Sequence, residues 1–202
     1  MGRPGLNRTA VIAAAADLAD ELGFDAVTIS VLARHLGVRS PTLYSHISGA
    51  TDLRTAVTAY VLDELADTTS RAMAGEGRDL LVAYADAIRD FARRSPGRYD
   101  ATTRQRVPPG QARESRTDSV GEAITAGRRN ADLALTVVRS YGIAETNDTY
   151  AVRLMSSLIH GYITLEMAGT FAHREPTSET TWPAVLEDLD RTLTRIATAQ
   201  CH

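Results

Sequence analysis

The chain of 202 residues contains no lysine, so all 22 of its basic residues are arginine. Its single cysteine, Cys201, excludes an internal disulfide, a zinc ribbon and a thioredoxin-type redox site. No apolar run approaches the ~18 residues that a membrane span requires. The alanine-rich stretch at residues 10–16 is followed by Asp17 too early to form the apolar core of a signal peptide. These absences predict a cytoplasmic protein.

Sequence motifs of common enzymes are also absent. The chain has no GxGxxG, GxxxxGK[ST], GxSxG or HExxH pattern. Glu187, Asp188 and Asp190 bring three carboxylates together near the C-terminus, but Arg191 follows at helical ion-pairing distance, which favours a solvated helix face over acid/base catalysis. Terminal Cys201 and a neighbouring histidine offer too few ligands for a metal site. We therefore expect no enzyme activity, no metal and no cofactor.

The charge is unevenly distributed along the chain. In total, 25 acidic residues against 22 basic ones give a net charge of -3, which argues against a protein that coats nucleic acid. Within the first fifty residues, however, all acidic residues lie between Asp17 and Asp25. Residues 26–51 contain no acidic residue, two arginines and two histidines. This window allows a local DNA-binding face, and the change in composition predicts a domain boundary near residue 50.

Apolar residues recur at helical spacing along nearly the whole chain, and no alternating run of β-branched residues indicates a strand. The first predicted helix is capped by Asn7 or Thr9 and ends at Gly23, and two short helices follow, one after Thr28 and one at Ser40-Pro41. A long helix is predicted from about Thr51. The remaining predicted helices lie at about 79–94, 97–105, 111–141, 147–172 and 182–199. The sequence therefore predicts an all-α protein of about nine helices.

The segment from Val27 to Ile47 has the pattern of a helix-turn-helix. Gly37 can adopt the left-handed turn between two short helices. Ser40 is expected to cap the second helix and Pro41 to occupy its first position, where a missing N–H costs nothing. Burial of Leu32, Leu36, Val38 and Leu43 leaves a polar, basic set exposed: Arg39, Ser40, Thr42, Tyr44, Ser45 and His46. Periodicity alone fits an αα-hairpin of a bundle equally well, but the lack of acidic residues favours a DNA-binding surface.

Residues 32–53, LARHLGVRSPTLYSHISGATDL, resemble the DNA-binding signature of tetracycline-repressor-like (TetR family) transcriptional regulators. The resemblance implies a three-helix DNA-binding domain at residues 1–50 and a larger helical domain for ligand binding and dimerisation at residues 51–202. It implies phosphate contacts for Thr28, Tyr44 and His46, base reading by Arg39, Ser40, Pro41 and Thr42, and arm contacts by Arg3 and Arg8. Where the family usually has a lysine this chain has Ala50, so either Arg54, one turn further on, substitutes for it or DNA binding is weaker.

Residues 156–171, SSLIHGYITLEMAGTF, preceded by RRSPGRYDAT at residues 93–102, are similar to the WHG-type C-terminal domain of one branch of the family, although the expected tryptophan is missing. The last two predicted helices have more apolar surface than one face requires, which fits either a large internal core or a subunit interface. The resemblance implies a four-helix dimer interface. Its expected residues are Leu158, Gly161, Leu165, Ala168, Leu186, Leu189 and Leu193.

Tyr84, Ile88 and Phe91 form an apolar stripe at helical spacing. Such stripes more often belong to a core than to a binding site, but the resemblance implies a pocket for a small, largely apolar ligand. Its other expected residues are Tyr99, Thr103, Val137, Met155 and His160. The whole pattern predicts a homodimeric repressor released from a near-palindromic DNA operator by a small molecule. The alternative is a helical small-molecule-binding or interaction protein with weakened or lost DNA binding.

Overall fold

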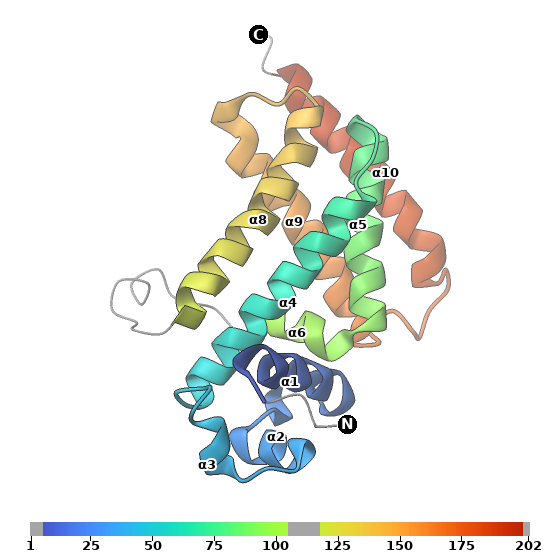
Figure 1. The fold of residues 1–202 in the computed structure, drawn as a ribbon. Coiled ribbons are helices and arrows are strands. Elements are labelled where there is room, and N and C mark those ends of the chain that lie inside the picture. Colours follow the sequence, from blue (N-terminus) through green and yellow to red (C-terminus); the bar gives the residue numbers. More distant parts are fainter. Residues whose placement is uncertain (1–5, 105–117, 200–202) are drawn as a thin grey trace. The chain divides into compact units, whose positions relative to one another are not determined.

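The structure is a computed structural model that describes residues 6–104 and 118–199. Over these ranges the chain forms nine α-helices, one 3-10 turn and no strand, so the predicted all-α fold is confirmed (Figure 1). The elements are α1 (Arg8–Leu22), η1 (Phe24–Ala26), α2 (Ile29–Leu36), α3 (Ser40–Leu43), α4 (Ala50–Ala72), α5 (Gly77–Arg94), α6 (Pro96–Arg104), α8 (Asp118–Ser140), α9 (Glu145–Met167) and α10 (Ser178–Thr198). No helix in the described ranges is long and apolar enough to cross a membrane.

Packing divides the chain into two compact units. The first comprises Met1–Leu65 and Arg94–Asn130, and the second comprises Ala66–Arg93 and Ala131–His202. Both α4 and α8 therefore contribute residues to each unit. The predicted domain boundary after residue 50 lies at the start of α4, whereas the compact units divide within α4, after Leu65.

The three N-terminal helices form the core of the first unit. Of the two residues predicted to cap α1, Asn7 and Thr9, the structure has Asn7, whose side chain accepts a hydrogen bond from the Ala10 N–H at 2.8 Å. The apolar stripe of α1 is buried, with Val11 fully enclosed and Leu18 at 2% exposure. Phe24 in η1 is also fully buried, so this short turn fills the core between α1 and the helices that follow.

Helix α6 packs closely against α1 within the same unit. Gly97 makes this approach feasible, since a Cβ atom built there would lie 1.8 Å from the carbonyl oxygen of Ala19. Arg98 then joins α1 to α4, forming an ion pair with Asp20 at 3.1 Å and with Glu64 at 2.8 Å. A hydrogen bond of 3.1 Å from the Thr58 hydroxyl to the Ala101 carbonyl adds a second link between α4 and α6. Helix α6 is thus anchored to α1 and α4 within the first unit.

In the second unit, an arginine of α5 is buried among carboxylates from α9 and α10. Arg89 is 5% exposed and lies 2.6 Å from Glu166 and 2.8 Å from Glu179. Its guanidinium also lies 5.0 Å from the centre of the Trp182 ring. The hydrogen bond from Arg89 is the main reason that the pKa of Glu166 is lowered to about 2. This cluster fixes the three helices to one another.

The ends of several helices differ from the prediction. Ser40 does not cap α3: Arg39 does, with φ −82° and ψ 146°, because the first turn closes by a 2.9 Å bond from the Thr42 N–H to the Arg39 carbonyl. Pro41 therefore occupies the second position of the helix. A backbone N–H at this position has no intrahelical acceptor, so the missing N–H of proline costs no hydrogen bond. Helix α9 ends at Met167 and not near 172, since Gly169 turns the chain at φ 72°. Residues 111–117 of the helix predicted at 111–141 lie outside the described ranges.

Candidate nucleic-acid interface

The turn between α2 and α3 has the expected geometry. Thr28 caps α2, accepting a hydrogen bond from the Val31 N–H at 3.3 Å. Gly37 ends the helix in the left-handed conformation, with φ 66° and ψ 31°, which glycine adopts without a steric penalty. The Val38 N–H then donates to the Ala33 carbonyl at 3.0 Å, so the chain reverses tightly into α3. Leu32 and Leu43 are buried and hold the two helices together.

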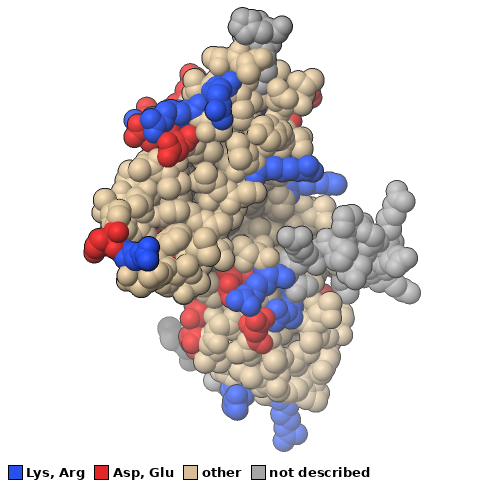
Figure 2. Space-filling view, turned by 180° about the vertical axis from the view of Figure 1, so that it is seen from behind, with Lys and Arg blue, Asp and Glu red and all other residues tan. Residues whose placement is uncertain are grey.

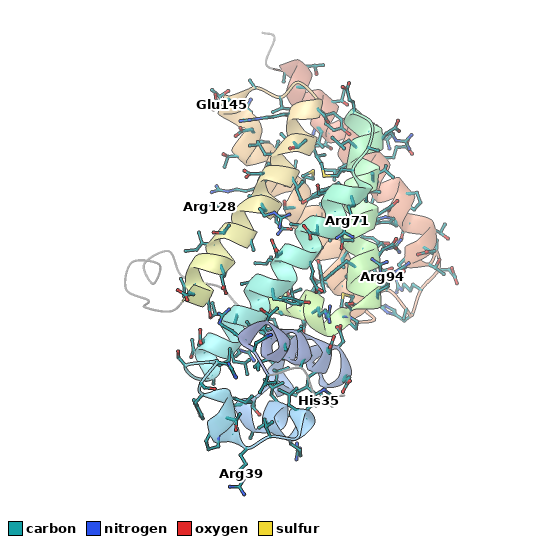
Figure 3. The ribbon with its side chains drawn as sticks, in the orientation of Figure 1. His35, Arg39, Arg71, Arg94, Arg128 and Glu145 are labelled. Atoms are coloured by element: carbon teal, nitrogen blue, oxygen red, sulfur yellow. The ribbon has the colours of Figure 1, made fainter. Side chains whose placement is uncertain are left out.

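The outward face of this turn carries the polar side chains predicted from the sequence. Arg39, Thr42 and Tyr44 are exposed, the last at 57%, while Ser40 and His46 are half-buried. In Figure 3 the Arg39 side chain points away from the neighbouring helices. Hydroxyl and guanidinium groups of this kind bind phosphate oxygens and base edges of DNA. The structure thus presents the predicted residues as one accessible surface.

The acidic residues that border this surface are already paired. Asp25 accepts hydrogen bonds from Arg54 at 3.1 Å and from Arg104 at 3.2 Å. Asp52 accepts one from the Ser48 N–H at 2.8 Å at the start of α4, and another from the Ser119 hydroxyl. The charge of Asp25 is therefore compensated by two guanidinium groups, whereas Asp52 has neutral hydrogen-bond donors and keeps its charge. The α2–α3 surface itself contains no acidic residue and is basic.

Two of the expected DNA contacts have partners inside the first unit. Arg54 lies 4.1 Å from the centre of the Phe24 ring and donates to the Phe24 carbonyl, besides its bond to Asp25. Arg8 begins α1 and makes two 3.1 Å hydrogen bonds to Glu122. Contact of either guanidinium with DNA therefore requires an exchange of partners. Arg3 lies outside the described residues.

Two exposed basic residues were not among the predicted contacts. Arg34 and His35 lie in the last turn of α2, within the same window without acidic residues, and that window was the signal that could have identified them. In Figure 2 arginines on the segment with α2 and α3 have no acidic side chain beside them, whereas elsewhere on the visible face the two charges mostly occur together. The basic surface thus includes the end of α2 as well as α3.

The predicted ligand-pocket residues are divided between the two units. Tyr84, Ile88 and Phe91 are buried along one side of α5, and Val137 and Met155 are fully buried in the same unit. Tyr99, which is buried, and Thr103, which is exposed, lie on α6 in the first unit. A cavity of about 350 Å³ in the second unit is lined by residues near the α9–α10 connection, and it includes none of this set.

Burial shifts the titration of two members of this set. Desolvation raises the pKa of Tyr84 to about 12 and lowers the pKa of the half-buried His160 from its ordinary value. Both side chains are therefore uncharged near neutral pH. An uncharged phenol and imidazole among apolar groups suit a ligand without net charge.

The predicted dimer-interface residues differ in their exposure. On α9, Gly161 is exposed, Leu165 is 46% exposed and Leu158 is half-buried, and Ala168, directly after the helix, is exposed. On α10, by contrast, the predicted residues are buried within the protomer: Leu186, Leu189 and Leu193. The inward face of α10 is thus used for the internal core, while the exposed face of α9 carries two large apolar side chains, Tyr150 and Leu165, among polar ones.

Comparison with known proteins agrees with this geometry. The sequence profile described as "Bacterial regulatory proteins, tetR family" matches residues 11–57, and the profile "Tetracyclin repressor-like, C-terminal domain" matches residues 81–189. The second match contains the Ser156–Phe171 segment. An uncharacterized HTH-type transcriptional regulator of Mycobacterium tuberculosis is 35% identical over 171 residues, which are 84% of this chain and 74% of the relative.

Solved structures share the fold. The crystal structure of BioQ with its natural double-stranded DNA operator superposes with a TM-score of 0.61 at 20% identity, covering 94% of this chain and 99% of the other. A TetR variant from Acinetobacter baumannii AYE in complex with minocycline gives a TM-score of 0.58 at 22% identity, with 96% of each chain covered. These structures are similar in fold.

Proposed function

Because this chain belongs to the TetR family and is a DNA-binding transcriptional regulator, we propose that it is a cytoplasmic homodimeric repressor, released from its operator by a small, largely apolar ligand. The observation that carries the proposal is the exposed α2–α3 surface, which lies in a window of 26 residues, 26–51, without a carboxylate. A structural neighbour, BioQ, was solved with its own DNA operator, which supports the same use of this surface.

The residues of the surface divide into two roles. Arg39, Ser40 and Thr42 lie at the start of α3, the part of a recognition helix that meets base edges in the major groove. Tyr44 and His46 follow at its end, where hydroxyl and imidazole groups contact phosphates and fix the register. Thr28 adds a hydroxyl at the start of α2. Sequence preference is thus assigned to the first group and general affinity to the second.

Dimerisation is proposed through the exposed face of α9. Tyr150 is 59% exposed and Leu165 is 46% exposed on this helix, and the exposed Gly161 between them permits a close approach of a second copy. Two copies related by a two-fold axis place their recognition helices in successive major grooves, about 34 Å apart. The operator is therefore expected to be nearly palindromic.

The ligand is proposed to bind among the buried α5, α8 and α9 residues of the second unit. The uncharged Tyr84 and His160 provide hydrogen-bonding groups, and Ile88, Phe91 and Met155 provide apolar contact. Helix α4 has residues in both units and is the expected route of coupling. A coupling free energy of ~1–3 kcal/mol changes operator affinity roughly 5–150-fold.

The test is a set of variants measured on an operator selected from random DNA. We expect Tyr44→Ala and His46→Ala to weaken binding to every sequence, and Arg39→Ala and Thr42→Ala to change the preference between sequences by ~1–3 kcal/mol at a contacted base pair. The control Arg191→Ala alters an exposed arginine of the second unit and should leave binding unchanged. If all four surface variants bind like the wild type, the assignment of this surface is wrong.

A further inference from the structure

A cavity of about 420 Å³ opens in the first unit between α1, α4 and α8. None of the residues assigned above to the ligand of the second unit lines it. It is lined by Arg8, Thr9, Ile12, Ala56, Ala59, Tyr60, Asp63, Glu122, Thr125 and Ala126. Its volume lies in the lower part of the ~300–1,000 Å³ range of small-molecule sites. The cavity is therefore a second place at which a ligand fits this chain.

The floor of this cavity is apolar and buried. Ile12 and Ala59 are each 5% exposed, Ala126 is 4% exposed and Ala56 is 1% exposed. Because three of these four side chains are methyl groups on two helices, their short reach leaves a hollow that larger side chains would have filled. Burial of a ligand's hydrocarbon against this floor is favourable at ~25 cal/mol per Å² of apolar surface removed from water.

The rim of the cavity is charged, and its described lining residues carry two carboxylates against one guanidinium. Arg8 is the single cation among these described residues, and Glu122 holds that guanidinium through two 3.1 Å hydrogen bonds. Arg8 also donates to the Ser119 hydroxyl at 2.7 Å, so its position is fixed. Asp63 then adds a second carboxylate that Arg8 does not neutralise. Its partner, Arg129, is not part of the lining.

The carboxylate of Asp63 is accessible to a ligand. Its side chain is 56% exposed and that of Arg129 is 43% exposed. Exposed ion pairs of this kind contribute ~0–1 kcal/mol, so a cation that also buries hydrocarbon in the cavity can take the place of Arg129 or share the carboxylate with it. The same rim disfavours an anion, because Arg8 is already engaged by Glu122.

The size of the site favours a small molecule over a helical partner. The lining extends over about one turn of α1 and of α8, and over two turns of α4 from Ala56 to Asp63. A volume of about 420 Å³ lies within the range of small-molecule sites, whereas a docked amphipathic helix occupies a longer groove with anchors at i, i+3 or i+4, and i+7. The occupant that matches both the volume and the charge is therefore a small molecule.

We propose that this α1–α4–α8 cavity binds a small amphipathic monocation, an amine carried on an aromatic or alkyl body. Its hydrocarbon lies on Ile12 and the alanine floor, and its ammonium group lies at Asp63. The proposal concerns the free protein and does not depend on the repressor function proposed above, so its test uses no DNA.

The experiment compares three probes with one phenylbutyl body: 4-phenylbutylamine, 4-phenylbutan-1-ol and 4-phenylbutyrate. Binding to the full chain is measured by isothermal titration at neutral pH. We expect the amine to bind about five-fold more tightly than the alcohol, the ratio that ~1 kcal/mol from an exposed charge pair produces. The carboxylate is expected to bind most weakly. Equal affinities for the three probes would overturn the proposal.

Variants locate the binding. Asp63→Asn is expected to remove the preference for the amine over the alcohol, and the matched control Asp132→Asn, an exposed carboxylate of α8 outside the lining, is expected to retain it. Thr125→Trp, at an exposed position of the wall, fills the hollow and should weaken all three probes. Circular dichroism checks that each variant is folded. Binding that survives Thr125→Trp, or a preference that survives Asp63→Asn, would show that the probes bind elsewhere and would refute the proposal.

Discussion

Replacement of Gly97 by alanine is expected to separate α6 from α1. The added Cβ would lie 1.8 Å from the Ala19 carbonyl oxygen and 2.7 Å from the Asp20 backbone nitrogen, whereas ordinary contact begins at 3.4 Å. Both neighbours are backbone atoms, so no side-chain rotation relieves the overlap. The two helices must move apart by about the difference, which is large for a close-packed interior.

The cost follows from the contacts at this junction. Overpacking of a core typically costs ~1–3 kcal/mol. A shift of this size also stretches the 2.9 Å hydrogen bond from the Arg98 N–H to Asp20, and the loss of one such bond costs ~0.5–1.5 kcal/mol. We therefore expect Gly97→Ala to lower the free energy of unfolding by ~2–4 kcal/mol.

Urea unfolding followed by circular dichroism measures this effect. The matched control is Gly121→Ala in α8, where an added Cβ meets nothing within 4 Å. Because alanine is better than glycine inside a helix, the control should gain ~0.5–1 kcal/mol. If Gly97→Ala is as stable as the control, the close approach of α6 and α1 is not as described, and the reasoning fails.

Three further predictions concern the second unit and the dimer. Arg89→Gln removes the main partner of the 11%-exposed Glu166 carboxylate, which keeps its ion pair with Arg93 at 2.8 Å. The loss of hydrogen bonds to a charged group should cost ~1.5–3 kcal/mol in urea unfolding, against less than ~1 kcal/mol for the exposed control Arg191→Gln. The pKa of Glu166 is lowered to about 2 from 4.5, so its contribution to stability is complete above pH 4.5 and is lost as the pH falls towards 2. In an acid titration followed by circular dichroism, Arg89→Gln should reduce this dependence of stability on pH. An acid transition that is unchanged in the variant would contradict the assignment. Leu165→Glu on the exposed face of α9 should convert a dimer to a monomer in analytical ultracentrifugation. The control Leu22→Glu, at a residue of α1 that is 54% exposed, should remain a dimer. If both variants are dimers, this face of α9 is not the dimer interface.

Local signals explain why much of the fold could be predicted. Asn7 and Thr28 cap their helices through side-chain bonds that span only three residues, so the sequence around each cap is sufficient to identify it. Gly37 was recognisable because the short turn requires a left-handed residue. The cap of α3 was misplaced by one residue because its position depends on backbone angles at Arg39 and not on a side-chain bond.

The interactions that sequence reasoning missed are long-range. Arg98 pairs with Asp20 and Glu64, which are 78 and 34 residues away, so no sequence pattern indicates that it joins α1 to α4. Arg54 likewise appeared available for DNA until packing brought it against Phe24. Periodicity predicted the apolar face of α10 but not whether it is used inside the protomer or between two copies, since both uses need the same spacing.

Selection of binding sites from random double-stranded DNA by the purified protein tests the central claim most directly. A dimer that presents two α2–α3 surfaces to successive major grooves should enrich a near-palindrome whose half-site centres are about 10 base pairs apart, or a multiple of this spacing. Arg39→Ala should then shift the bases enriched within each half-site while the spacing remains the same. Absence of an enriched palindrome, or identical sites selected by Arg39→Ala and the wild type, would contradict the assignment of this surface to operator recognition.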